Sequence, residues 1–159
     1  MKRTAAVALV AGIALALLGV APAVADTGDE VPDPQIAAMM DEVPGGVLID
    51  SHHAVWPELE MEMTVPDTRA GSFTAMAAVG ACESGRVCVF TGYSLAGATL
   101  SWGTCGYHAI PSSFSARSVA DARSTGKAQA RSGTSVLATA AAGGWANIYG
   151  TANNVLCYF

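Results

Sequence analysis

Short runs of β-forming residues recur at intervals of about ten residues between Ala81 and the end of the chain, and glycine and serine separate them. Strands at this spacing with turn residues between them are typical of an all-β sandwich or barrel. Aliphatic residues are few here and alanine is frequent, so the expected core is small. We predict seven strands, at Arg86–Phe90, Thr99–Trp102, Ser118–Ala122, Ala128–Arg131, Ser135–Thr139, Trp145–Tyr149 and Val155–Phe159.

A faint internal repeat runs through this region, and its matched positions are all separated by the same number of residues. Because its period is about half the length of the domain, it predicts two four-stranded units, each a Greek key. Chance similarity in a chain rich in glycine, alanine and serine is the alternative. The matched positions are Gly85-Arg86 with Gly126-Lys127, Thr91-Gly92 with Ser132-Gly133, Ser94-Leu95 with Ser135-Val136, and Gly103 with Gly144.

The start of the chain, residues 1–25, has the features of a cleavable secretory signal peptide. Lys2 and Arg3 precede an uncharged apolar stretch from Ala5 to Val20, and Ala23-Val24-Ala25 follows as a small-x-small cleavage pattern. A membrane anchor needs a longer stretch, of roughly 20 apolar residues. A lipoprotein needs a cysteine after the apolar run, which is absent. We therefore expect residues 1–25 to be removed and the product to be secreted, extracellular and without a stable membrane anchor.

Charge divides the remaining chain into an acidic segment, residues 26–80, and a mildly basic domain, residues 81–159. The segment has eleven acidic residues and one basic residue, Arg69, whereas the domain has two acidic and five basic residues. The overall net charge of −5 argues against nucleic-acid binding, which needs clustered bases. The segment could dock on the domain through this asymmetry or simply keep the chain soluble.

The acidic segment contains patterns of its own. Residues 35–43 predict a short helix after Pro34, with apolar residues at helical spacing. Residues 47–65 predict a hairpin with a turn at Pro57-Glu58, and its apolar stripe is Leu59, Met61, Met63 and Val65. Because a lone hairpin is unstable in water, we expect it to pair with an edge of the C-terminal sheet. Residues 66–80 have the composition of a linker.

All four cysteines lie in the C-terminal domain, at Cys82, Cys88, Cys105 and Cys157. An even number of cysteines in an exported chain predicts two disulfides. The spacing lacks the close pairs that a structural zinc site needs.

Several of these residues together resemble a known family. The sequence Cys82-Glu-Ser-Gly-Arg-Val-Cys88-Val-Phe90 is followed by Gly97, Ala98-Thr99-Leu100-Ser101-Trp102, Cys105-Gly106 and Arg117-Ser118-Val119. This arrangement resembles the βγ-crystallin fold and, within it, the bacterial secreted metalloproteinase-inhibitor family. The resemblance covers about half of the chain, and the second unit departs from it, with Arg131 in place of Phe90 and Ala138 in place of Gly97.

The resemblance implies a small βγ-crystallin-like Greek-key sandwich that blocks an extracellular protease with a rigid, disulfide-braced loop. We predict the pairs Cys82–Cys88 and Cys105–Cys157, although four cysteines allow two other connectivities. Some relatives bind calcium through paired Asn or Asp residues just before the serine. Ser115-Ala116 stand there in this chain, so we expect no calcium, no other metal and no cofactor.

Catalytic chemistry finds little support in the sequence. His108 and Asp121 allow a Ser–His–Asp set by composition alone, but no Gly-x-Ser-x-Gly elbow is present, and we expect His108 to lie in a surface loop. His52-His53 beside Asp50 suggest a metal, yet neighbouring strand residues face opposite ways, so solvated histidines are the better interpretation. We expect a protein that is not an enzyme.

Binding by aromatic side chains is the remaining candidate chemistry. Of Tyr93, Trp102, Tyr107, Trp145 and Tyr149, most are expected in the core or in strand pairs. Gly92 and Tyr93, in a turn, are the predicted exposed binding loop. The alternative to a protease inhibitor is a cell-surface module that binds carbohydrate or protein without inhibitory activity.

Overall fold

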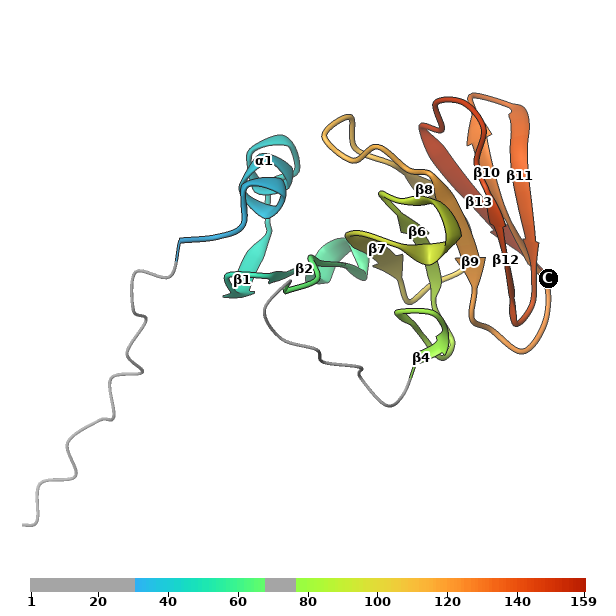
Figure 1. The fold of residues 1–159 in the computed structure, drawn as a ribbon, viewed down its shortest axis with the longest axis horizontal. Coiled ribbons are helices and arrows are strands. Elements are labelled where there is room, and N and C mark those ends of the chain that lie inside the picture. Colours follow the sequence, from blue (N-terminus) through green and yellow to red (C-terminus); the bar gives the residue numbers. More distant parts are fainter. Residues whose placement is uncertain (1–30, 68–76) are drawn as a thin grey trace, which may run out of the picture.

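A computed structural model describes residues 31–67 and 77–159 (Figure 1). The predicted signal peptide, residues 1–25, and residues 68–76 of the predicted linker lie outside the described residues. In the described part the chain is mostly antiparallel β-structure with one α-helix and two disulfides. None of the helices found there is long and apolar enough to cross a membrane.

Two sheets form the body of the molecule. The larger has seven strands in the order β1-β2-β3-β7-β6-β9-β12, and the smaller has four in the order β11-β10-β13-β8. The seven strands are β1 (Val47–Asp50), β2 (His53–Trp56), β3 (Met61–Thr64), β6 (Val87–Phe90), β7 (Thr99–Trp102), β9 (Ser118–Asp121) and β12 (Gly144–Asn147). The four are β8 (Tyr107–Ala109), β10 (Lys127–Ser132), β11 (Ser135–Ala141) and β13 (Asn154–Tyr158).

The strands after residue 86 form two units of four, β6–β9 and β10–β13. Each unit gives three strands to one sheet and its third strand to the other, so that β12 joins the large sheet and β8 joins the small one. This exchange interlocks the units, and one apolar core lies between the two sheets. The disulfide Cys105–Cys157 bridges the two units, and together with Cys82–Cys88 it confirms the predicted pairing.

Equivalent hydrogen bonds in the two units show that they are built alike. The Ser118 hydroxyl donates to the Gly92 carbonyl at 2.8 Å, and the Asn154 amide donates to the Gly133 carbonyl at 3.0 Å. Gly92 and Gly133 are one of the matched pairs of the sequence repeat. Two further equivalent bonds run from Arg117 N to Phe90 O at 2.7 Å and from Asn153 N to Arg131 O at 2.8 Å.

The acidic segment extends the large sheet, which confirms that it belongs to the folded unit. β1, β2 and β3 form a three-stranded meander rather than the predicted hairpin, because a second turn lies at Ser51-His52. β3 pairs antiparallel with β7, with Met61 opposite Trp102 and Met63 opposite Leu100. Met61, Met63 and Val65 are buried as predicted. Leu59 is not, with 49% of its surface exposed. Pro57 begins a 3-10 turn, η1 (Pro57–Leu59), so the strand alternation starts only at Met61.

Helix α1 (Pro34–Glu42) lies beside β1 at the end of the molecule far from β11 (Figure 1). Its start agrees with the sequence, because Pro34 occupies the first turn and the Asp33 side chain accepts from Gln35 N. Ile36 and Met39 are fully buried in the main core.

Glu42, the last residue of the helix, contacts the chain that connects β8 and β9. The Glu42 carboxylate accepts hydrogen bonds from Ser112 N at 2.6 Å and Ser113 N at 2.8 Å. Bonds from Ser113, its hydroxyl first, and from the Ser112 backbone lower the pKa of Glu42 to about 2. The charged carboxylate therefore fixes α1 to the C-terminal domain.

We expect Glu42→Gln to lower the free energy of unfolding by about 1 kcal/mol at pH 7, a value reduced because Glu42 is exposed. The folded pKa is depressed, so the stabilisation is complete above pH 4.5 and is lost as the pH falls to about 2. Denaturant unfolding of wild type and variant should thus converge over this range. Glu58→Gln, which removes a carboxylate from η1, is the control and should change little; equal effects of the two substitutions would contradict the assignment.

Candidate binding site

The chain between β6 and β7 forms a compact turn, residues 91–98, which we call the 91–98 loop. Thr91 and Ala98 close its base, since Thr91 N donates to Ala98 O and Ala98 N donates to the Thr91 hydroxyl. Gly92 N donates to Ala96 O at 2.8 Å, and Ala96 N donates to Tyr93 O at 3.2 Å. The loop includes the short 3-10 turn η2 (Tyr93–Leu95). Four backbone N–H groups of the loop, those of Thr91, Gly92, Ala96 and Ala98, are therefore satisfied within it.

Three residues of the loop have left-handed backbone conformations. Gly97 has φ 81°, which suits glycine, and a Cβ there would collide with the Thr91 hydroxyl. Ser94 and Leu95, at φ 54° and 65°, have no such freedom. Non-glycine residues in this region cost of order 1–3 kcal/mol each and persist only where the surroundings hold them. The loop is thus held in one shape by its neighbours.

Two strands supply that support. Ser94 N donates to Asn147 Oδ1 on β12 at 2.9 Å, and Leu95 N donates to the Ser118 hydroxyl on β9 at 3.1 Å. Because Ser118 also donates to Gly92 O, one side chain fixes both sides of the loop. The loop is consequently tied to both four-stranded units.

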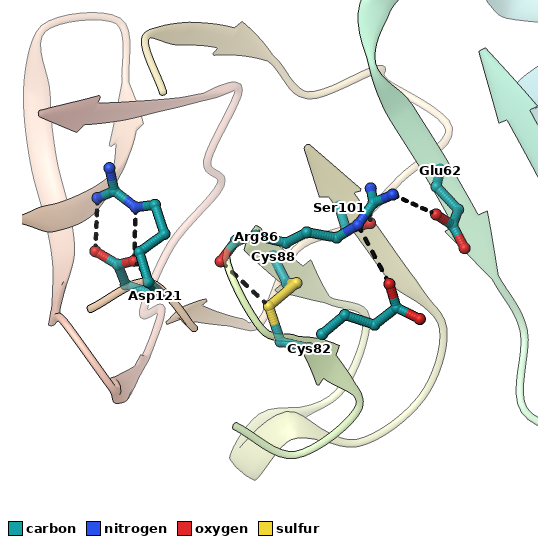
Figure 2. Close-up of a disulfide and its surroundings, with 8 residues drawn as sticks. Glu62, Cys82, Arg86, Cys88, Ser101 and Asp121 are labelled. Carbon is teal, nitrogen blue, oxygen red and sulfur yellow. Dashed lines mark hydrogen bonds and ion pairs between the residues drawn. A yellow bond between two sulfur atoms is a disulfide. The ribbon is translucent and has the colours of Figure 1, made fainter. Parts of the chain in front are cut away.

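A second, smaller core supports the loop from below. Val87, Val89 and Val119 face the main core, so the alternating residues of β6 and β9 project from the opposite face of the sheet. Leu95 packs there against a buried cluster of Val79, Cys82, Cys88, Phe90, Ala120 and Ala122. The Cys82–Cys88 disulfide belongs to this cluster (Figure 2).

Residues 77–79 take part in the same layer. They were expected to belong to the linker, but they form β4 (Ala77–Val79), which pairs with β5 (Cys82–Glu83). The Val79 side chain is buried in the smaller core, and this burial stabilises the segment as a strand rather than a linker.

Arg86 connects the acidic segment with this outer layer (Figure 2). Its guanidinium lies 2.8 Å from a Glu62 oxygen on β3 and 3.4 Å from a Glu83 oxygen on β5, and it donates to the Ser101 hydroxyl at 3.1 Å. The ion pair between Arg86 and Glu62 therefore joins the basic domain to the acidic segment, two regions of opposite net charge.

Exposed aromatic side chains surround the 91–98 loop. Tyr93 is 47% exposed and Tyr149 is 74% exposed, and their ring centroids lie 5.9 Å apart. The Arg117 guanidinium lies 6.0 Å from the centre of the Tyr93 ring. Trp145 is 46% exposed and lies on β12 two positions before Asn147, which binds the loop. The two side chains therefore project from the same face of the strand. We call Tyr93, Tyr149 and Arg117 the Tyr-Arg surface.

The candidate catalytic pair is not assembled for catalysis. His108 lies on β8 rather than in a surface loop; its ring stacks on Trp102 with centroids 5.1 Å apart, and Nε2 lies 2.9 Å from Thr104 O. Burial lowers the pKa of His108, although the Thr104 bond and the Glu60 charge act in the opposite direction. Asp121 is fully buried, and both of its oxygens accept from the Arg123 guanidinium.

The two adjacent histidines have separate partners. The His52 ring lies 2.8 Å from the Ser51 hydroxyl, and His53 Nε2 lies 2.9 Å from a Glu62 oxygen without the alignment of a hydrogen bond. Within residues 31–67 and 77–159, no three His, Cys, Asp or Glu side chains are grouped so as to hold a metal ion.

The aromatic predictions were right in part. Tyr93 is exposed and Trp102 is buried, as expected. Tyr107 and Trp145 lie in paired strands but keep their side chains exposed, and Tyr149 is exposed after β12. Sequence reasoning did not place Arg117 or Tyr149 beside Tyr93. The available signal for Tyr149 was its position next to the aliphatic Ile148, because adjacent residues of an extended chain face opposite ways.

No protein-family model matches the chain, and no curated protein or solved structure matches it either.

Proposed function

We propose that this protein is a secreted binding protein that presents the 91–98 loop to a protein partner, and that this partner is an extracellular protease whose cleft the loop blocks. The observation that carries the proposal is the anchored shape of the loop with Tyr93 exposed. A loop already held in its bound shape loses little conformational entropy on association. Tyrosine and arginine are also the side chains that often dominate binding energy at protein interfaces.

We also propose that the fold is a double Greek key of the βγ-crystallin type. The exchange of the third strands between two sheets and the equivalent Ser118 and Asn154 bonds support it. Secretion with removal of residues 1–25 is proposed from the sequence. Two disulfides and the lack of a spanning helix in the described residues are compatible with it.

The alternative function is a module that binds protein or carbohydrate at a cell surface and inhibits nothing. The Tyr93–Tyr149 pair favours it, because exposed aromatic rings provide contact area for either ligand. Both functions act by binding and need no catalytic residue.

The test is a titration of metallo- and serine proteases with the full mature chain. We expect inhibition of at least one protease, and Tyr93→Ala should weaken it by about tenfold or more, the loss of a central interface tyrosine. Tyr107→Ala is the matched control, since Tyr107 is 66% exposed but lies on β8. Inhibition of none of the proteases, or equal losses in both variants, would rule out inhibition through this loop.

A further inference from the structure

A cavity lies beside the Tyr-Arg surface, between the two connections that precede β9 and β13. Its volume is about 220 Å³, and residues 110–112, 114–117 and 150–153 line it. At about 30 Å³ per water molecule this is room for roughly seven waters, enough for one side chain of a ligand. Ile110, Phe114 and Ala152 give it apolar walls, and Arg117 stands among the lining residues.

The backbone of Arg117 is fixed while its guanidinium is free. Its N–H donates to Phe90 O on β6 at 2.7 Å, and its carbonyl accepts at 2.8 Å from the N–H of Ile148, the residue that follows β12. Within the described residues, the only polar or ring partner of the guanidinium is the Tyr93 ring. The other arginines there are bound to side-chain oxygens: Arg86 to Glu62 and Glu83, Arg123 to Asp121, and Arg131 to Gln129.

The charge around the cavity favours an anionic ligand. No acidic residue is among those that line it. Glu42 contacts the same segment, but its two oxygens accept from Ser112 N and Ser113 N instead of binding Arg117. Among the described residues, Arg117 is therefore a cation without a counter-charge, and it is one of the residues that line this partly apolar cavity.

We propose that Arg117 and this cavity form a subsite for a peptide carboxylate, an inference that rests on the proposed function and names the chemistry of its partner. The guanidinium fork matches a carboxylate with two parallel hydrogen bonds. An apolar side chain next to the carboxylate fills the cavity, and Tyr93 and Tyr149 pack against the adjoining peptide. The carboxylate belongs either to a C-terminus or to an aspartate or glutamate side chain.

Three short acetylated probes distinguish these sources. The first is Ala-Ala-Leu with a free C-terminus, the second is the same peptide amidated, and the third is amidated but carries an internal glutamate before the leucine. Binding to the full mature chain is followed by two-dimensional NMR, using the amide signals of residues 112–117 and the Nε–H signal of Arg117. The same spectra show whether each variant is folded.

We expect one of the carboxylate peptides to bind at least about tenfold more tightly than the amidated control. Arg117→Gln should remove this preference, and Arg117→Lys, which keeps the charge but loses the fork, should retain part of it. Arg131→Gln, the control, should bind as wild type does.

Equal binding of the three probes, binding of none, or an unchanged preference in Arg117→Gln would overturn the subsite. Preferential binding of a sulfated disaccharide at Arg117 would overturn it as well, in favour of an anionic sugar. Carboxylate binding in a protein that inhibits no protease would leave the subsite standing and reject only the inhibitor function. Inhibition of a protease that is unaffected by Arg117→Gln would leave the inhibitor function standing and reject the subsite.

Discussion

Replacing Trp56 with alanine should lower the free energy of unfolding by about 3–5 kcal/mol, the usual cost of truncating a buried aromatic residue. Trp56 is 1% exposed and sits on β2, opposite Met61. Its indole N–H donates to Val43 O at 2.8 Å, and its ring lies against Gly46. The substitution thus removes packing from the main core and leaves the Val43 carbonyl without its partner.

The size of this effect tests whether the acidic segment unfolds together with the C-terminal domain. Trp145→Ala is the matched control: it removes the same side chain from β12, where it is 46% exposed, and should cost less than about 1 kcal/mol. Denaturant unfolding followed by circular dichroism measures both. Similar stabilities of the two variants, with the meander lost in Trp56→Ala, would show that residues 31–67 contribute nothing to the cooperative fold.

The strands of the two units could be predicted from the sequence because their runs of β-formers are separated by turn residues. All seven predicted strands are present, at β6, β7 and β9–β13. β8 was missed because it has only three residues, which is too short for a recognisable pattern, and its pairing with β13 makes it a strand. Pairing of the acidic segment could be predicted from the stripe Met61, Met63 and Val65, but not that β7 would be the edge it joins.

The candidate site was predictable only where its residues are local in sequence. Gly92 and Tyr93 were found as a turn because glycine marks it. Arg117 and Tyr149 come from other segments and reach Tyr93 only because β9 pairs with both β6 and β12. Single-sequence patterns carry no information on that long-range register. Asn154, the equivalent of Ser118, was missed for a related reason, because the offset between these two positions is shorter than the constant offset of the visible repeat.

The Asp121–Arg123 pair carries the other large expected effect. Asp121 is fully buried at the end of β9, and the Arg123 side chain is 9% exposed. Arg123 binds the carboxylate through Nε at 2.8 Å and Nη2 at 2.7 Å. Its guanidinium also lies 5.2 Å from the centre of the Phe159 ring. The pair therefore links the last strand of the first unit to the C-terminal residue.

Arg123→Met should lower the free energy of unfolding by about 3–5 kcal/mol, because it leaves the Asp121 carboxylate buried without a counter-charge. The double variant Asp121→Asn/Arg123→Met should be more stable than Arg123→Met alone, since the buried charge is then gone. Arg86→Met is the control. Its partner Glu62 is 21% exposed and Arg86 itself 26%, so water screens the pair and about 1 kcal/mol is expected. Thermal and denaturant unfolding of the four proteins give the comparison. Equal losses for Arg123→Met and Arg86→Met, or no recovery in the double variant, would mean that packing of the arginine side chain, rather than the buried charge pair, stabilises this end of the sheet.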